Sequence, residues 1–260
     1  MKKYILSTII FMLVGILATA VVRKIFPKCE YLVKGDETAL KDVEVLINTN
    51  IGYSLDFGTA EEFFEKRNSL DKHSGKEIIY EAALVTATGN NEYFNKYSQF
   101  EFHIEQVITG EQDILEKDIP FYIDNTFYTV TNDYSDLYFK GELGYTEETH
   151  PWFFNFIDNY YGMLNVPKKG HHYLIVYYKV QPVKTESPVY FINSGCDRLS
   201  CYFDFESPKN DKIIDPDTPC YMKYYLDNQT FFYDEDSLKS YMKLKESVFE
   251  YYGVEDLLEN

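Results

Sequence analysis

Short segments in which apolar and polar residues alternate are the feature that most restricts the fold of this chain. Phe100, Phe102 and Ile104 alternate with polar side chains. Successive side chains of a β-strand point to opposite faces, so this period predicts a strand with one buried and one wet face. Similar patterns and unbroken apolar runs predict further strands at residues 78–88, 119–123, 173–178, 189–192 and 202–205. Residues 127–131 either continue the strand at 119–123 or follow it as a separate one.

Two helices are predicted on either side of these strands in the sequence. Thr59 and Glu62 form a capping box that opens a helix over residues 60–68. An apolar stripe that ends at Gly253 predicts an amphipathic helix over residues 237–252.

A third helix and the order of the strands predict the architecture. Pro151 suits a first helical turn and Gly162 a C-terminal stop, which places a helix between the third and fourth strands. Five strands with a helix at this position is the order of the OB-fold, a small five-stranded barrel. We therefore expect a mainly β, α+β domain over residues 58–260, with an OB-like barrel and a C-terminal amphipathic helix. Residues 37–48 fit both a helix and a strand.

The chain also resembles a group of exported domains over residues 58–205. The resemblance rests on an acidic helix at residues 59–64, a strand at residues 100–110, and the turn PKKG at residues 167–170 that leads into another strand. These segments look like the OB-type, netrin-like or TIMP-like modules of Gram-positive bacteria. In animal inhibitors of that class a free N-terminal cysteine chelates a protease metal. Cys29 would become terminal only after an unusual cut, so we do not expect inhibitory chemistry here.

The N-terminal segment predicts export. Lys2 and Lys3 precede an uncharged stretch at residues 4–22 that is long enough to cross a bilayer. A cleavable signal peptide is the alternative, because Ala-Thr-Ala precedes a cleavage point after Ala20. We expect a single-pass protein of the cell membrane with an extracytoplasmic domain, or a secreted protein. The predicted parts are a membrane anchor or signal peptide at residues 1–24, a juxtamembrane segment at 25–57 and the extracytoplasmic domain at 58–260.

Four cysteines fall in or near the predicted exported part. Cys196 and Cys201 flank four residues, a spacing that could bring them together across the end of a hairpin. Cys196 and Cys201 are therefore the candidate disulfide pair, and a metal or redox pair fits the spacing poorly. The pairing of Cys29 and Cys220 stays open.

Composition restricts the partners. The chain has 25 Lys and Arg against 42 Asp and Glu, a formal net charge of −17. Such a charge disfavours nucleic acid and anionic envelope surfaces as partners. The 25 tyrosines often occur in pairs, and in a strand one of each pair would face the core and the other would face out. The outward rings could supply contact area for a partner, although a compositional bias would give the same enrichment.

No motif indicates catalysis or metal binding. His171 and His172 are neighbours at the start of a predicted strand, so their side chains would point to opposite faces and could not chelate one ion. No spacing singles out two of the 42 carboxylates as an acid and a base. We therefore expect no catalytic, cofactor-binding or metal site.

These observations favour a binding or interaction module outside the cytoplasm. The expected partner is another envelope protein or an uncharged glycan, with the membrane contacted only through the N-terminal segment. One alternative is an exported hydrolase whose site is assembled from distant residues around His171 or His172. The other is an acidic immunity or inhibitor protein that neutralises a basic toxin.

Overall fold

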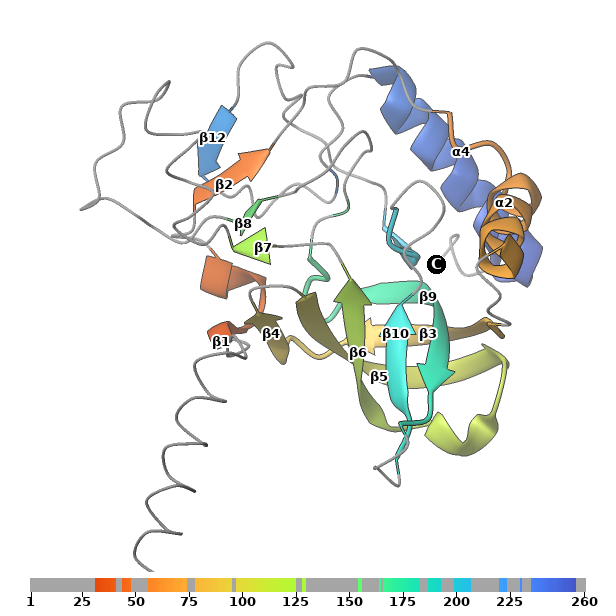
Figure 1. The fold of residues 1–260 in the computed structure, drawn as a ribbon, viewed down its shortest axis with the longest axis horizontal. Helices are drawn as coiled ribbons and strands as arrows, with labels where there is room; N and C mark the ends of the chain where they lie inside the picture. The colour runs from red at the N-terminus through yellow and green to blue at the C-terminus, as the bar shows by residue number, and fades with distance from the viewer. Residues whose placement is uncertain are drawn as a thin grey trace, which may run out of the picture. The chain divides into compact units, whose positions relative to one another are not determined.

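The computed structural model describes fourteen stretches of the chain (Figure 1). It divides the chain into two compact units, Met1–Glu30 and Tyr31–Asn260. The first unit, with the predicted anchor or signal peptide, lies outside the described residues. Among the described residues, no helix is both long and apolar enough to span a membrane. The described residues are 31–40, 44–47, 56–73, 78–94, 97–124, 128–129, 154–155, 164, 166–182, 187–192, 199–206, 220–223, 230 and 235–255.

Five strands form a closed barrel. Around the barrel the order is β5, β3, β9, β10 and β6, and β6 pairs back onto β5. All of these contacts are antiparallel except the one between β10 and β6, which is parallel. The mainly β fold and the barrel are thus confirmed. The strands are β3 (Glu81–Ala87), β5 (Tyr97–Thr109), β6 (Asp118–Asp124), β9 (His172–Val180) and β10 (Val189–Ile192).

Further strands extend this sheet or form a second one. β1 (Tyr31–Gly35) pairs with β4 (Asn91–Phe94), which pairs with β5, and β11 (Tyr202–Asp204) pairs with β9. The second sheet has the order β12, β2, β8, β7. Its strands are β12 (Cys220–Lys223), β2 (Glu44–Ile47), β8 (Phe154–Asn155) and β7 (Tyr128–Thr129). The described residues also form two 3-10 turns, η1 (Glu37–Leu40) and η2 (Gln112–Ile114).

The helix expected between Pro151 and Gly162 is wrong where the structure can test it. Phe154–Asn155 form β8, which pairs with β2 on one side and β7 on the other. Aromatic residues fit a pleated sheet well, and here the cross-strand pairing overrides the helix-boundary signals. The other residues of that predicted helix lie outside the described part of the chain.

The undecided segment at residues 37–48 contains both kinds of structure. Glu37–Leu40 form η1 and Glu44–Ile47 form β2. Strands β1 and β2 therefore fall in the segment expected to be juxtamembrane. β1 belongs to the sheet that contains the barrel, and β2 belongs to the second sheet.

Aromatic rings fill the barrel. Phe121 contacts Tyr177 at a centroid distance of 5.2 Å, and Phe102 contacts both Phe121 and Tyr173 at about 6 Å. These rings are almost fully buried. Tyr177 points inward while its neighbour Tyr178 is only half-buried, which confirms that a tyrosine pair on a strand divides between the two faces.

Helices α2 (Ala60–His73) and α4 (Glu235–Tyr252) lie side by side (Figure 1). The predicted capping box opens α2, because the Thr59 backbone N–H donates to Oε2 of Glu62 at 2.9 Å. Hydroxyls of α4 serve the same end of α2: the Ala60 N–H donates to Oγ of Ser247 and the Phe57 N–H to Oγ of Ser240, each at 2.9 Å. The start of α2 is therefore completed by α4.

Helix α4 also covers β11. Phe205 stacks on Phe249 at 4.7 Å between centroids, and Phe203 stacks on Tyr241 at 6.4 Å. The helix ends as predicted at Gly253, which has a φ of +66°. The following N–H of Val254 donates to the Phe249 carbonyl at 2.9 Å and closes the last turn.

Candidate functional site

His171 pairs with two carboxylates beside β11. Its Nδ1 is 3.0 Å from Oδ2 of Asp204, and its Nε2 is 3.6 Å from Oε1 of Glu206. Asp204 is 8% exposed and also accepts the Glu206 backbone N–H at 2.9 Å. Both ring nitrogens face carboxylates, so this cluster joins the start of β9 to the end of β11.

His172 lies in a separate cluster on the outer face of the barrel. Its Nδ1 is 3.0 Å from Oγ1 of Thr86 and 3.2 Å from Oε2 of Glu105. In a hydrolase triad one ring nitrogen takes the proton of the nucleophile, while the acid contacts the other ring nitrogen and orients the ring. Here the hydroxyl and the carboxylate share one nitrogen, and the His172 side chain is 60% exposed. The cluster is not arranged as a catalytic triad.

His103 is the only other histidine whose side chain the structure describes. His103 pairs with Asp118 at 2.8 Å on the barrel surface. His150 lies outside the described residues, as does the side chain of His73. Within the described part of the chain, no group of three or more His, Cys, Asp or Glu side chains could hold a metal ion.

Cys201 is fully buried, and its thiol donates to the Leu199 carbonyl at 3.8 Å. Cys196 lies outside the described residues. The disulfide between Cys196 and Cys201 therefore stays a prediction.

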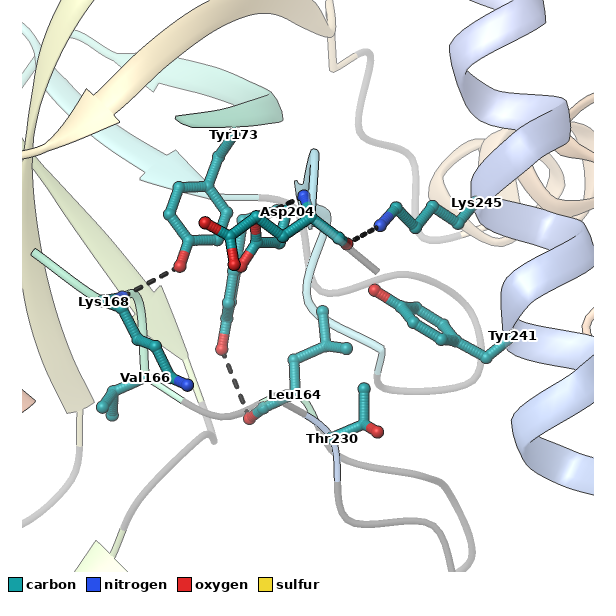
Figure 2. A pocket seen from close by; sticks show the side chains of 10 residues that line it. Leu164, Val166, Lys168, Tyr173, Asp204, Thr230, Tyr241 and Lys245 are labelled. Atoms are coloured by element: carbon teal, nitrogen blue, oxygen red, sulfur yellow. Dashed lines mark hydrogen bonds between the residues drawn. The ribbon is translucent and has the colours of Figure 1, made fainter. Parts of the chain in front are cut away.

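A polar pocket lies between β11 and α4, and we call it the α4 pocket (Figure 2). Lys245 and Tyr241 reach into it from α4, toward Asp204 of β11 (Figure 2). Nζ of Lys245 donates to the Glu206 carbonyl at 2.5 Å and lies 5.7 Å from the centre of the Phe249 ring. The pocket is lined by Leu164, Val166, Lys168, Tyr173, Tyr202, Asp204, Glu206, Thr230, Tyr241 and Lys245.

Burial sets the protonation behaviour of the α4 pocket. Lys245 is only 6% exposed, and the loss of hydration lowers its pKa to about 8, while Asp204 and Glu206 act in the opposite direction. Burial, followed by the charge of Asp204, raises the pKa of the Tyr241 hydroxyl. The pocket thus keeps the Tyr241 hydroxyl neutral, and Lys245 loses its proton at a lower pH than an exposed lysine does.

The size of the α4 pocket limits what it can bind. Its free volume is about 20 Å³, which is room for about one water molecule. It contains a buried lysine and a carboxylate but no space for an organic substrate. We therefore interpret it as a set of polar contacts that hold α4 against the barrel.

A much larger open groove lies where the approach to β3 meets the end of β9, and we call it the β3–β9 groove. Its volume is about 750 Å³, within the range of small-molecule sites. Its apolar lining consists of Ile78, Ile79, Tyr178 and Val180, and its polar lining of Glu81, Glu111, Lys179 and Gln181. Ile79 is 77% exposed and Val180 is 43% exposed, so two large aliphatic side chains of the groove face solvent.

Lys179 forms ion pairs with both carboxylates on the polar side of this groove. Nζ of Lys179 is 2.8 Å from Oε2 of Glu111 and 3.3 Å from Oε1 of Glu81. The hydrogen bond to Glu111 is the largest of the effects that raise the pKa of Lys179, so the ammonium stays charged. Gly110 makes room for the buried Glu81, because a Cβ at Gly110 would lie 2.6 Å from the Glu81 carboxylate.

Four half-buried aromatic rings continue from the groove across the outside of the barrel. Tyr178 contacts Tyr80 at 6.0 Å and stacks on Phe191 at 5.3 Å, and Phe191 contacts Tyr122 at 5.7 Å. Phe191 lies opposite Tyr178 on one neighbouring strand and opposite Tyr122 on the other. We call Tyr80, Tyr178, Phe191 and Tyr122 the outer aromatic strip. It crosses β9, β10 and β6 and shares Tyr178 with the groove.

Sequence reasoning did not identify the groove or the α4 pocket. The doubled tyrosines did predict outward rings, and Tyr178 is one of them. The sequence does contain a signal that Lys245 is buried. It lies four residues after Tyr241 and four before Phe249, both on the apolar stripe of the helix. The chain matches no protein-family model and no curated protein sequence.

Proposed function

We propose that this chain is a binding module built on an OB-type barrel, acting outside the cytoplasm and either tethered by its N-terminal segment or secreted. An OB-fold is a five-stranded Greek-key barrel. The closed order of β3, β5, β6, β10 and β9, with its single parallel contact, supports this type of barrel.

The outer aromatic strip is the observation that carries the binding function. It places four large rings on one outer surface of the barrel, next to an open groove of about 750 Å³. Rigid aromatic side chains supply contact area at a low cost in conformational entropy, which is why binding surfaces are rich in them.

The partner is an envelope protein or an uncharged glycan. A net charge of −17 disfavours nucleic acid and anionic polymers. The histidine clusters described above give no arrangement that would favour hydrolysis.

The test is affinity capture from the native envelope with the full chain and two variants. Phe191→Ser removes the centre of the outer aromatic strip, and Tyr251→Ser is the matched control because Tyr251 is a 56% exposed aromatic residue on α4. We expect a partner that the wild type and Tyr251→Ser retain and Phe191→Ser loses. Equal capture by all three proteins, with circular dichroism showing that each is folded, would contradict the proposal.

The location is tested separately on the same native material. Intact mass analysis shows whether the chain begins at Met1 or, after cleavage behind Ala20, at Val21. Fractionation then assigns the protein to the membrane or the medium. Recovery of the intact chain from the cytosol would contradict export.

A further inference from the structure

The β3–β9 groove combines an exposed aliphatic surface with an acidic rim. We propose that this groove binds a peptide segment of a partner protein that carries both apolar and basic side chains. This inference rests on the binding function proposed above and names the class of ligand.

The aliphatic side of the groove favours a protein ligand. Ile79 and Val180 present large apolar side chains to solvent at 77% and 43% exposure. Burying each of them against an apolar side chain of a partner would remove apolar surface from water and favour binding. Exposed apolar groups of this kind, rimmed by polar residues, are typical of protein interaction sites.

The aromatic residues beside the groove offer sugar rings only part of their flat faces. Sugars stack on the flat faces of aromatic rings, whereas Tyr178 and Phe191 stack on each other with an interplanar angle of 14°. Each ring therefore covers one face of the other. This arrangement favours a partner that packs against ring edges and aliphatic groups, as peptide side chains do.

The acidic rim selects basic over acidic segments. Lys179 is held between Glu81 and Glu111, so the three side chains together carry one net negative charge. The Glu111 side chain is 68% exposed, and its carboxylate can accept a hydrogen bond from an arginine or lysine of a ligand. The net charge of −17 steers cations toward the chain and opposes a second copy as the occupant.

The experiment measures binding of short fluorescent peptides of equal length to the full chain by polarisation. The probes are an alternating Arg-Leu peptide, an Arg-Ser peptide and a Glu-Leu peptide, with a labelled cello-oligosaccharide as the glycan probe. We expect the Arg-Leu peptide to bind at least about tenfold more tightly than each of the others, because only it satisfies both sides of the groove.

Two groove variants locate the binding. Ile79→Ser is expected to weaken Arg-Leu binding by about tenfold through lost apolar contact, and Glu111→Lys by a similar factor through charge reversal. The matched controls are Met242→Ser and Glu250→Lys, which alter an exposed apolar and an exposed acidic residue on α4. Both controls should bind as the wild type does.

Several results would overturn the inference. They are preference for the cello-oligosaccharide, equal binding of the Arg-Ser peptide, or unchanged affinity in both groove variants. Sedimentation of the chain without peptide tests the remaining occupant. If the chain self-associates and Ile79→Ser abolishes the association, the groove binds a second copy and the inference is overturned. A native partner lost in Phe191→Ser but retained in both groove variants would refute the groove as its site and leave the binding function standing.

Discussion

Replacing Lys245 with methionine should stabilise this protein at neutral pH. The side chain is 6% exposed, and burial lowers its pKa from 10.5 to about 8. A difference of about 2.5 pKa units corresponds to about 3 kcal/mol against the charged form in the folded state. Methionine has a similar length and no charge, so Lys245→Met removes this cost.

Some stabilising contacts are lost with the lysine. The hydrogen bond to the Glu206 carbonyl and the contact with the Phe249 ring together contribute on the order of 1 kcal/mol or more. Asp204 keeps its bonds to His171 and to the Glu206 N–H, so it is not left without a partner. The expected net gain in the free energy of unfolding is therefore about 1 to 2 kcal/mol at pH 6.5.

The pH dependence gives a second, independent signature. The pKa of Lys245 is lower in the folded than in the unfolded chain, so the folded chain releases this proton first as the pH rises. Wild-type stability therefore gains from this group between about pH 8 and pH 10.5, while below pH 8 the cost is complete. The advantage of Lys245→Met should be largest at pH 6.5 and should shrink by pH 9.5.

Urea unfolding of both proteins at pH 6.5, 8 and 9.5 tests this reasoning. Only the difference between them is interpreted, because the buried tyrosines titrate in the same way in each. Lys243→Met, which changes an exposed lysine of the same helix, should match the wild type at every pH. A Lys245→Met protein less stable than the wild type at pH 6.5, or an advantage that does not shrink, would refute the account of the α4 pocket.

Three further changes test the packing described above. Ser247→Ala should cost about 1 kcal/mol, because it removes the acceptor of the Ala60 N–H, and hydrogen exchange should quicken at the start of α2. Gly110→Ala should lower the thermal midpoint by several degrees, since its Cβ would meet the Glu81 carboxylate at a φ of +116°; an unchanged midpoint would mean that the two do not approach each other. Gly253→Ala should cost only about 1 kcal/mol in denaturant unfolding, because space around its Cβ is open and only the positive φ opposes it; a loss like that of Gly110→Ala would contradict this.

The strands of the barrel were predictable because their side-chain period is visible in the sequence. The segment at 189–192 matches β10, and the segment at 173–178 lies within β9. β8 was not predictable, because Phe154 and Asn155 acquire their conformation from two partner strands distant in sequence. β4 was missed for a related reason, since its Asn91 also continues a Gly-Asn-Asn turn signal.

The sites were less predictable than the fold because they depend on exposure and on pairs distant in sequence. Ile79 belongs to an apolar run that predicts a strand, and nothing in the run indicates that this residue is 77% exposed. Lys179 pairs with Glu81 and Glu111. These three residues come from different strands or loops, so no local spacing in the sequence reveals the cluster.

The dependence of α2 on hydroxyls from α4 has a consequence for synthesis. During translation the barrel strands emerge before Ser240 and Ser247, which are the acceptors for the amides at the start of α2. The start of α2 therefore gains these two acceptors only after residues 240–247 have been synthesised. A product that stops before Ser240 would leave these amides to water, and their hydrogens should exchange faster than in the full chain.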